Sequence, residues 1–94
     1  MEVYSTFQRE FMQTLSCVQE VCVQTALCQQ EGTLEEQFYN ITAEVIIGIM
    51  EMIDGYANPS IGKLNVICPK NGESLKNPPM ELHDEVCKYL KGLN

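Results

Sequence analysis

The 94-residue sequence contains no tryptophan, one histidine and only six lysines and arginines, against 13 aspartates and glutamates. Positive charge is scarcest in residues 1–62, where Arg9 is the single basic residue beside nine acidic ones. A surface of this sign repels the phosphate backbone, so the composition argues against nucleic-acid binding. The formal net charge of −7 favours solubility or a basic protein partner instead.

The sequence also has no long hydrophobic run. Its longest apolar stretch, residues 45–50, is far shorter than the roughly 20 residues that a membrane-spanning helix needs. The first ten residues do not place a basic region before an apolar one, as a secretory signal does. We therefore expect no membrane partner and a cytoplasmic location.

The cysteine pattern excludes two further classes. The count is odd and no two cysteines are spaced as Cys-x-x-Cys, so neither a disulfide framework nor a thioredoxin-like redox pair is indicated. Reduced thiols fit a cytoplasmic compartment. The five are Cys17, Cys22, Cys28, Cys68 and Cys87.

Apolar residues recur at helical spacing in two long segments. In residues 3–30 they fall at intervals of three and four, which predicts an amphipathic helix that ends before Gly32. Thr33 and Glu36 have the spacing of a capping box and predict the start of a second helix. Asp54 and Gly55 are a plausible end for it.

The remaining third of the chain is rich in turn signals. Asn71-Gly72 is typical of a two-residue hairpin turn, so residues 62–76 are expected to form a loop or a small β-hairpin. Asn77 suits the N-cap of a last helix and Pro78 its first position.

The expected fold is therefore mainly α, and residues 1–94 are expected to form a single small helical domain. A long antiparallel helix hairpin is followed by a turn-rich loop or small β-hairpin and a C-terminal helix. The residues expected in its core are Phe7, Phe11, Leu15, Val18, Cys22, Leu34, Phe38, Ile41, Val45, Ile49, Met52, Leu82, Val86 and Tyr89.

The second predicted helix carries more apolar surface than a surface helix needs. Besides its core row it has a second one, for which we predict an interface: Tyr39, Ile46, Met50 and Ile53. The first hypothesis is thus a non-enzymatic interaction module that forms a homodimer, since two-fold dimers are the commonest way to cover such a surface. The alternative is that the last helix and the 60s loop cover this row within one chain.

Two other functions remain open. The acidic balance of residues 1–62 fits an inhibitor, immunity or antitoxin-like protein that covers a basic site on its partner. Cys68, His83 and Cys87 could instead serve a metal- or thiol-dependent sensor or enzyme, because His83 and Cys87 are four residues apart on one helical face.

We expect no enzyme activity, no cofactor and no metal. The glycines match no phosphate-binding loop. Glu44, Glu51 and Asp54 form one strip of the second helix without the Glu-x-x-His spacing of di-iron bundles, and the strip is interpreted as a solvated face.

Overall fold

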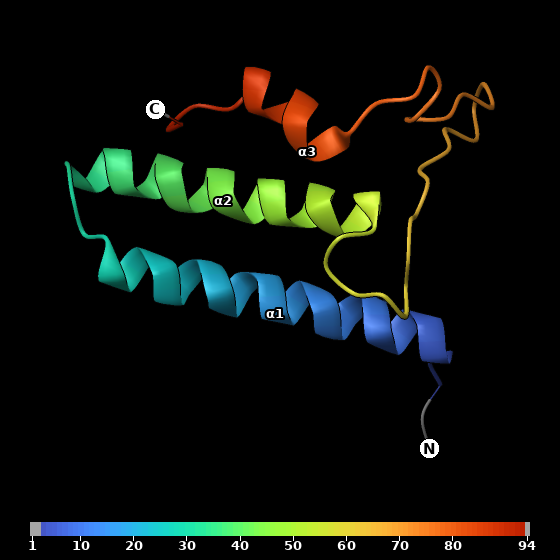
Figure 1. Ribbon diagram of the computed structural model, residues 1–94, viewed down its shortest axis with the longest axis horizontal. Helices are drawn as coiled ribbons and strands as arrows, with labels where there is room; N and C mark the ends of the chain where they lie inside the picture. The colour runs from blue at the N-terminus through green and yellow to red at the C-terminus, as the bar shows by residue number, and fades with distance from the viewer. Residues whose placement is uncertain (1–2, 94) are drawn as a thin grey trace.

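A computed structural model describes residues 3–93 of the chain. The helices follow along the chain in the order α1 (Thr6–Cys28), α2 (Leu34–Asp54), α3 (Leu82–Glu85) and a 3₁₀ turn, η1 (Val86–Lys88). Helices α1 and α2 form the expected antiparallel hairpin, and α3 lies on the other side of α2 (Figure 1). The predicted mainly helical fold is confirmed, with α2 as the central element.

Both long helices begin with a capping box. Thr33 accepts the backbone N–H of Glu36, and the Glu36 carboxylate reaches back to the N–H of Thr33, as predicted. Ser5 and Gln8 make the same exchange at the start of α1. Helix α2 ends at Gly55, whose φ of 97° is the left-handed conformation that glycine adopts most readily.

Close approach of α1 and α2 depends on Gly48. A Cβ atom at this position would lie 2.7 Å from Cγ1 of Val18 on α1. The loop after α2 is also tied to α1, because the side-chain amide of Asn58 donates to the hydroxyl of the buried Thr14. The first half of the loop therefore crosses the open end of the hairpin (Figure 1).

Residues 62–76 form a loop with one antiparallel bridge, between Ile67 and Ser74. The predicted two-residue turn at Asn71-Gly72 is wrong in detail. Cys68 donates its N–H to Glu73 and accepts that of Gly72, so four residues close the turn. No extended strand forms within residues 3–93.

The start of the last helix was also predicted wrongly. Asn77 and Pro78 are joined by a cis peptide bond, and α3 begins only at Leu82. The physical reason is that a residue before proline is disfavoured in the α conformation, which affects Asn77 before Pro78 and Pro78 before Pro79. The helix is one turn followed by a 3₁₀ turn.

The buried core is smaller than predicted. Within residues 3–93 the buried hydrophobic side chains are Ala43, Met52, Ile53 and Leu82. Two of the predicted core residues, Met52 and Leu82, are among them. Of the others, four are exposed and the rest are half-buried; the exposed ones are Phe7, Leu34, Phe38 and Tyr89. Tyr89 is 85% exposed because the 3₁₀ turn rotates it away from the stripe of a regular helix.

Candidate functional site: a buried ion-pair cluster and an open apolar face

The C-terminal end of α2 carries a buried carboxylate that joins three segments. Asp54 has no exposed surface. Its Oδ1 lies 2.6 Å from Nζ of Lys76 in the loop. Its Oδ2 accepts the backbone N–H of His83 at 3.0 Å and lies 2.6 Å from Nδ1 of the same residue. The carboxylate thus satisfies a free N–H in the first turn of α3, where Glu81 provides no side-chain cap.

The pKa shifts of Asp54 and His83 follow from this geometry. Burial alone would raise the pKa of Asp54, but the ammonium of Lys76 and N–H groups of His83 and Leu82 together hold that pKa well below its usual range. The hydrogen bond to Asp54 raises the pKa of His83, against a smaller lowering by burial, and the negative charge of Asp84 adds to the rise. Neighbouring charges therefore favour the ionised form of both side chains.

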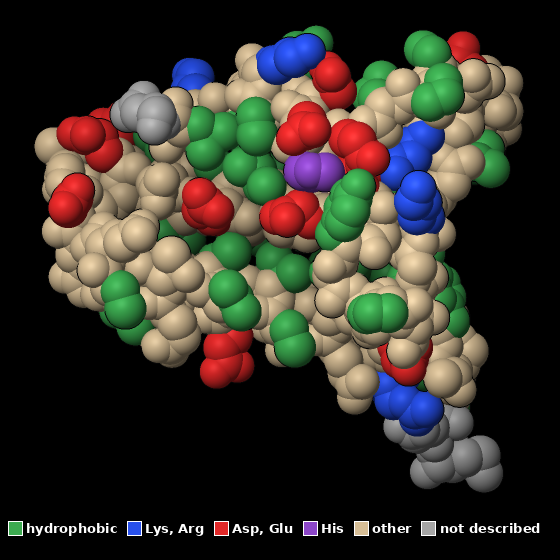
Figure 2. Space-filling model, viewed as in Figure 1, with side chains coloured by type: hydrophobic (Ala, Val, Ile, Leu, Met, Phe, Trp, Pro, Cys, Tyr) green, Lys and Arg blue, Asp and Glu red, His purple; other side chains and the backbone are tan. Residues whose placement is uncertain are grey.

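Two more side chains complete the cluster. The hydroxyl of Tyr56 donates to Oε1 of Glu81 at 3.2 Å, which raises the pKa of the tyrosine. The ring of Tyr56 also meets that of His83 edge-on, with centroids 5.3 Å apart. Figure 2 shows the histidine at the surface among acidic side chains, with basic side chains beside the group. We call this group the Asp54 cluster; its members are Asp54, Tyr56, Lys76, Glu81 and His83.

The predicted metal or thiol set is not brought together. Among residues 3–93, the ligand atoms that gather belong to Asp54, Glu81 and His83. Cys87 instead donates its thiol to the carbonyl oxygen of His83, and both Cys68 and Cys87 are exposed.

Sequence reasoning missed the Asp54 cluster. It interpreted Asp54 as part of a solvated strip, which is wrong, although Glu44 and Glu51 of that strip are exposed. The partners lie 22 and 29 residues away along the chain, so no local pattern joins them. The available signal was that Asp54 occupies the last turn of a strongly apolar helix.

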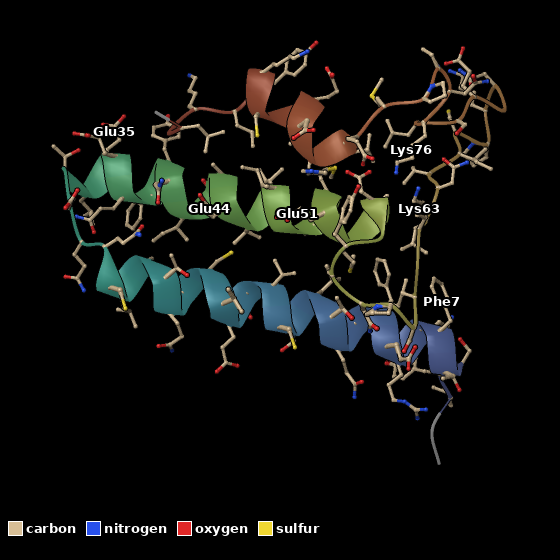
Figure 3. The ribbon with its side chains drawn as sticks, in the orientation of Figure 1. Phe7, Glu35, Glu44, Glu51, Lys63 and Lys76 are labelled. Carbon is tan, nitrogen blue, oxygen red and sulfur yellow. The ribbon has the colours of Figure 1, made fainter. Side chains whose placement is uncertain are left out.

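Helix α2 has two open sides of opposite character. The N-terminal half touches the C-terminal segment, where the side chain of Asn40 donates to Gly92, and Gly48 faces α1. Glu44 and Glu51 are exposed on one open side (Figure 3). Residues two apart on a helix lie about 200° apart around its axis, so the positions two before and two after each of these glutamates fall on the opposite side. The side chains at those positions are apolar or uncharged. This open apolar face comprises Phe38, Thr42, Ile46 and Ile49.

The predicted interface residues lie on or beside this face. Tyr39 is exposed, Ile46 and Met50 are half-buried, and Ile53 is buried where its carbonyl accepts the N–H of Leu64. A shallow hollow of about 350 Å³ opens at the N-terminal end of the face, lined by Glu35, Phe38, Tyr39 and Thr42.

Comparison of the chain with protein-family models, with curated proteins and with solved structures found no match. No helix within residues 3–93 combines the length and the apolar character required to cross a membrane.

Proposed function

We propose that this protein is a non-enzymatic interaction module that pairs with a second copy of itself through the open apolar face of α2. The observation that carries the proposal is the size of its accessible surface. A single chain exposes 7160 Å², whereas a compact monomeric protein of this mass exposes about 5,500 Å². Its radius of gyration is 15.2 Å, compared with about 12 Å for a compact domain of this length.

The excess of about 1,700 Å² has the size of a dimer interface. Obligate homodimers bury roughly 2,000–5,000 Å² in total, which is about 1,000–2,500 Å² for each chain. Three large hydrophobic side chains exposed on α2 supply apolar area for such an interface: Leu34, Phe38 and Tyr39.

Charge supports a second copy as the occupant of this face. Two chains of net charge −7 repel each other except where their contact surfaces are nearly uncharged. The open apolar face has Glu35 only at its rim, while Glu44 and Glu51 project from the opposite side. A two-fold axis near Thr42 would pair apolar residues and keep the acidic rows apart.

The compartment proposed for this module is the cytoplasm. None of the five cysteines is paired in a disulfide within the described chain, and four of them are exposed. Exposed thiols persist most readily where the environment is reducing.

A variant of the open apolar face tests the proposal. Phe38→Ser combined with Ile46→Asn removes apolar contact area at two points of the face about two turns apart. We expect wild type to elute as a dimer in size-exclusion chromatography with light scattering, and the variant as a helical monomer. Tyr89→Ser, which removes the most exposed aromatic side chain from a different element, serves as the control and should remain dimeric.

Two outcomes would contradict the proposal. Wild type and the double variant would have the same mass if this face were not the interface. An unfolded double variant would mean that the row belongs to the core of a single chain, the alternative that the sequence left open.

A second function, covering a basic site on another protein, is favoured by the exposed acidic row of α2. Glu44 and Glu51 lie seven residues apart on one side and are visible between α1 and α3 (Figure 3). Their exposure leaves both carboxylates available to lysine and arginine side chains. A complex of this kind would weaken steeply between low and high salt in wild type and be lost on Glu44→Gln, Glu51→Gln.

A further inference from the structure

Three side chains in the Asp54 cluster present ligand atoms to one point. One carboxylate oxygen each from Asp54 and Glu81 and one ring nitrogen of His83 all lie within 4.8 Å of one another. Asp54 comes from the end of α2, whereas Glu81 and His83 flank the start of α3, so the fold itself assembles the set. One imidazole nitrogen with two carboxylate oxygens is a donor set that suits Zn²⁺ and related divalent ions.

The outer atoms of all three ligands already have partners. Oδ1 of Asp54 is held by Lys76, and Oε1 of Glu81 accepts the hydroxyl of Tyr56. Nε2 of His83 lies 3.5 Å from Oδ1 of Asp84. Metal-binding carboxylates are oriented in this way, by hydrogen bonds to the atoms that do not touch the ion, whereas Nε2 of His83 has only the charge of Asp84 nearby. Each ligand therefore keeps its other atom, Oδ2, Oε2 or Nδ1, for the common point.

One of these inner atoms lacks a donor. Oε2 of Glu81 is buried and finds no hydrogen-bond donor among residues 3–93; Nδ1 of His83, at 3.9 Å, is too distant. A buried oxygen without a partner is uncommon and needs a physical explanation. An ion between Oε2, Oδ2 and Nδ1 would provide one.

We propose that Asp54, Glu81 and His83 form a three-ligand site for a divalent transition-metal ion of the zinc type. The ion takes the place of the proton on Nδ1 of His83, which leaves to solvent. The Nδ1–Oδ2 contact of 2.6 Å then opens to about 3 Å, the spacing of two ligands that each bind Zn²⁺ at about 2.0–2.2 Å. Lys76 stays on Oδ1 and offsets part of the charge of the two carboxylates.

One ligand of the site reaches the surface, whereas Asp54 and Oε2 of Glu81 are buried. The His83 side chain is 24% exposed and lies on the surface seen in Figure 2. Three protein ligands leave the fourth position of a tetrahedral ion to water, which is the arrangement of open zinc sites rather than closed structural ones.

The test is Zn²⁺ binding by isothermal titration calorimetry. Exposed thiols also bind zinc, so the titrated protein carries serine in place of the four exposed cysteines: Cys17, Cys28, Cys68 and Cys87. We expect one Zn²⁺ for each chain and a higher thermal midpoint with the ion. In this background Glu81→Gln should weaken binding at least 10-fold, the lower end of the losses seen when metal-site groups are changed.

Matched variants distinguish a site from loose attraction to an acidic surface. Glu85→Gln removes an equal charge from α3 outside the cluster, where Glu85 pairs with Lys88, and should leave Zn²⁺ affinity unchanged. His83→Gln should abolish binding. Because Glu81 is partly exposed, Glu81→Gln is expected to remain folded even if a change at His83 disrupts α3. No saturable binding, or equal weakening by Glu81→Gln and Glu85→Gln, would overturn the proposal.

Discussion

Asp54 is the residue on which the arrangement of α3 depends. Its carboxylate binds Lys76 of the loop and both the backbone and the ring of His83, and it has no contact with water. A buried carboxylate is tolerated only when its oxygens are paired, so these three contacts act together. They fix the one-turn helix on α2 although that helix is too short to be stable alone.

The two pKa shifts predict how stability varies with pH in metal-free protein. The pKa of Asp54 is lower in the folded chain, so its contribution is complete above the unfolded value of about 4 and is lost as the pH falls below it. The pKa of His83 is higher in the folded chain, so its contribution is complete below about 6.5 and is lost as the pH rises through the folded value.

Urea unfolding with a chelator present measures this profile. The free energy of unfolding should be greatest between about pH 4 and pH 6.5 and fall on both sides. His83→Gln should flatten the alkaline fall and leave an acid fall. If wild type and His83→Gln lose stability equally between pH 6 and pH 9, at fixed protein concentration, the account of this ion pair is wrong.

At the scale of elements, local signals located the two long helices and left the last one poorly placed. The Thr33 capping box and the Gly55 stop predicted both ends of α2 to the residue, because each signal acts on backbone groups within about four residues of itself. The Ser5–Gln8 box was present in the sequence and was overlooked. Helix α3 depends on Asp54, 28 residues before its start, and no local pattern carries that information.

The contact between α1 and α2 offers a test at Gly48. Alanine here would gain about 1 kcal/mol in helix propensity but would overlap the stiff, branched side chain of Val18, at a cost of about 1–3 kcal/mol. We expect Gly48→Ala to destabilise wild type. In a Val18→Ala background the overlap is gone, and the same change should stabilise by about 1 kcal/mol.

Urea unfolding of the four proteins at one protein concentration gives the coupling between the two sites. A reversal of sign between backgrounds is the expected result. If Gly48→Ala has the same effect in both, α1 and α2 do not approach each other at this point as described.

At the scale of the whole molecule, one chain buries little of its apolar surface. Four hydrophobic residues of the described part are buried, and the exposed large ones extend from Val3 before α1 to Tyr89 after η1. The sequence indicated the surplus on α2 but left open whether the last helix and the 60s loop cover it. Helix α3 is too short to cover the whole row, although the loop after α2 reaches Ile53, which is buried and whose carbonyl accepts the N–H of Leu64.

The proposed zinc site and the proposed dimer interface lie at different ends of α2. The Asp54 cluster lies at the C-terminal end of α2, whereas the hollow of the open apolar face lies at its N-terminal end, beside Glu35 and Phe38. The interface variant should therefore bind Zn²⁺ normally, and Glu81→Gln should remain a dimer.

The central claim is that a second copy completes the fold, and the dependence of the thermal midpoint on protein concentration tests it most directly. Association that favours the native state raises the midpoint as protein concentration increases, here from about 0.1 to about 100 μM, followed by circular dichroism. We predict a steady rise for wild type and none for the Phe38→Ser, Ile46→Asn variant. A wild-type midpoint that stays constant over this range would contradict the claim and show that the chain is stable alone.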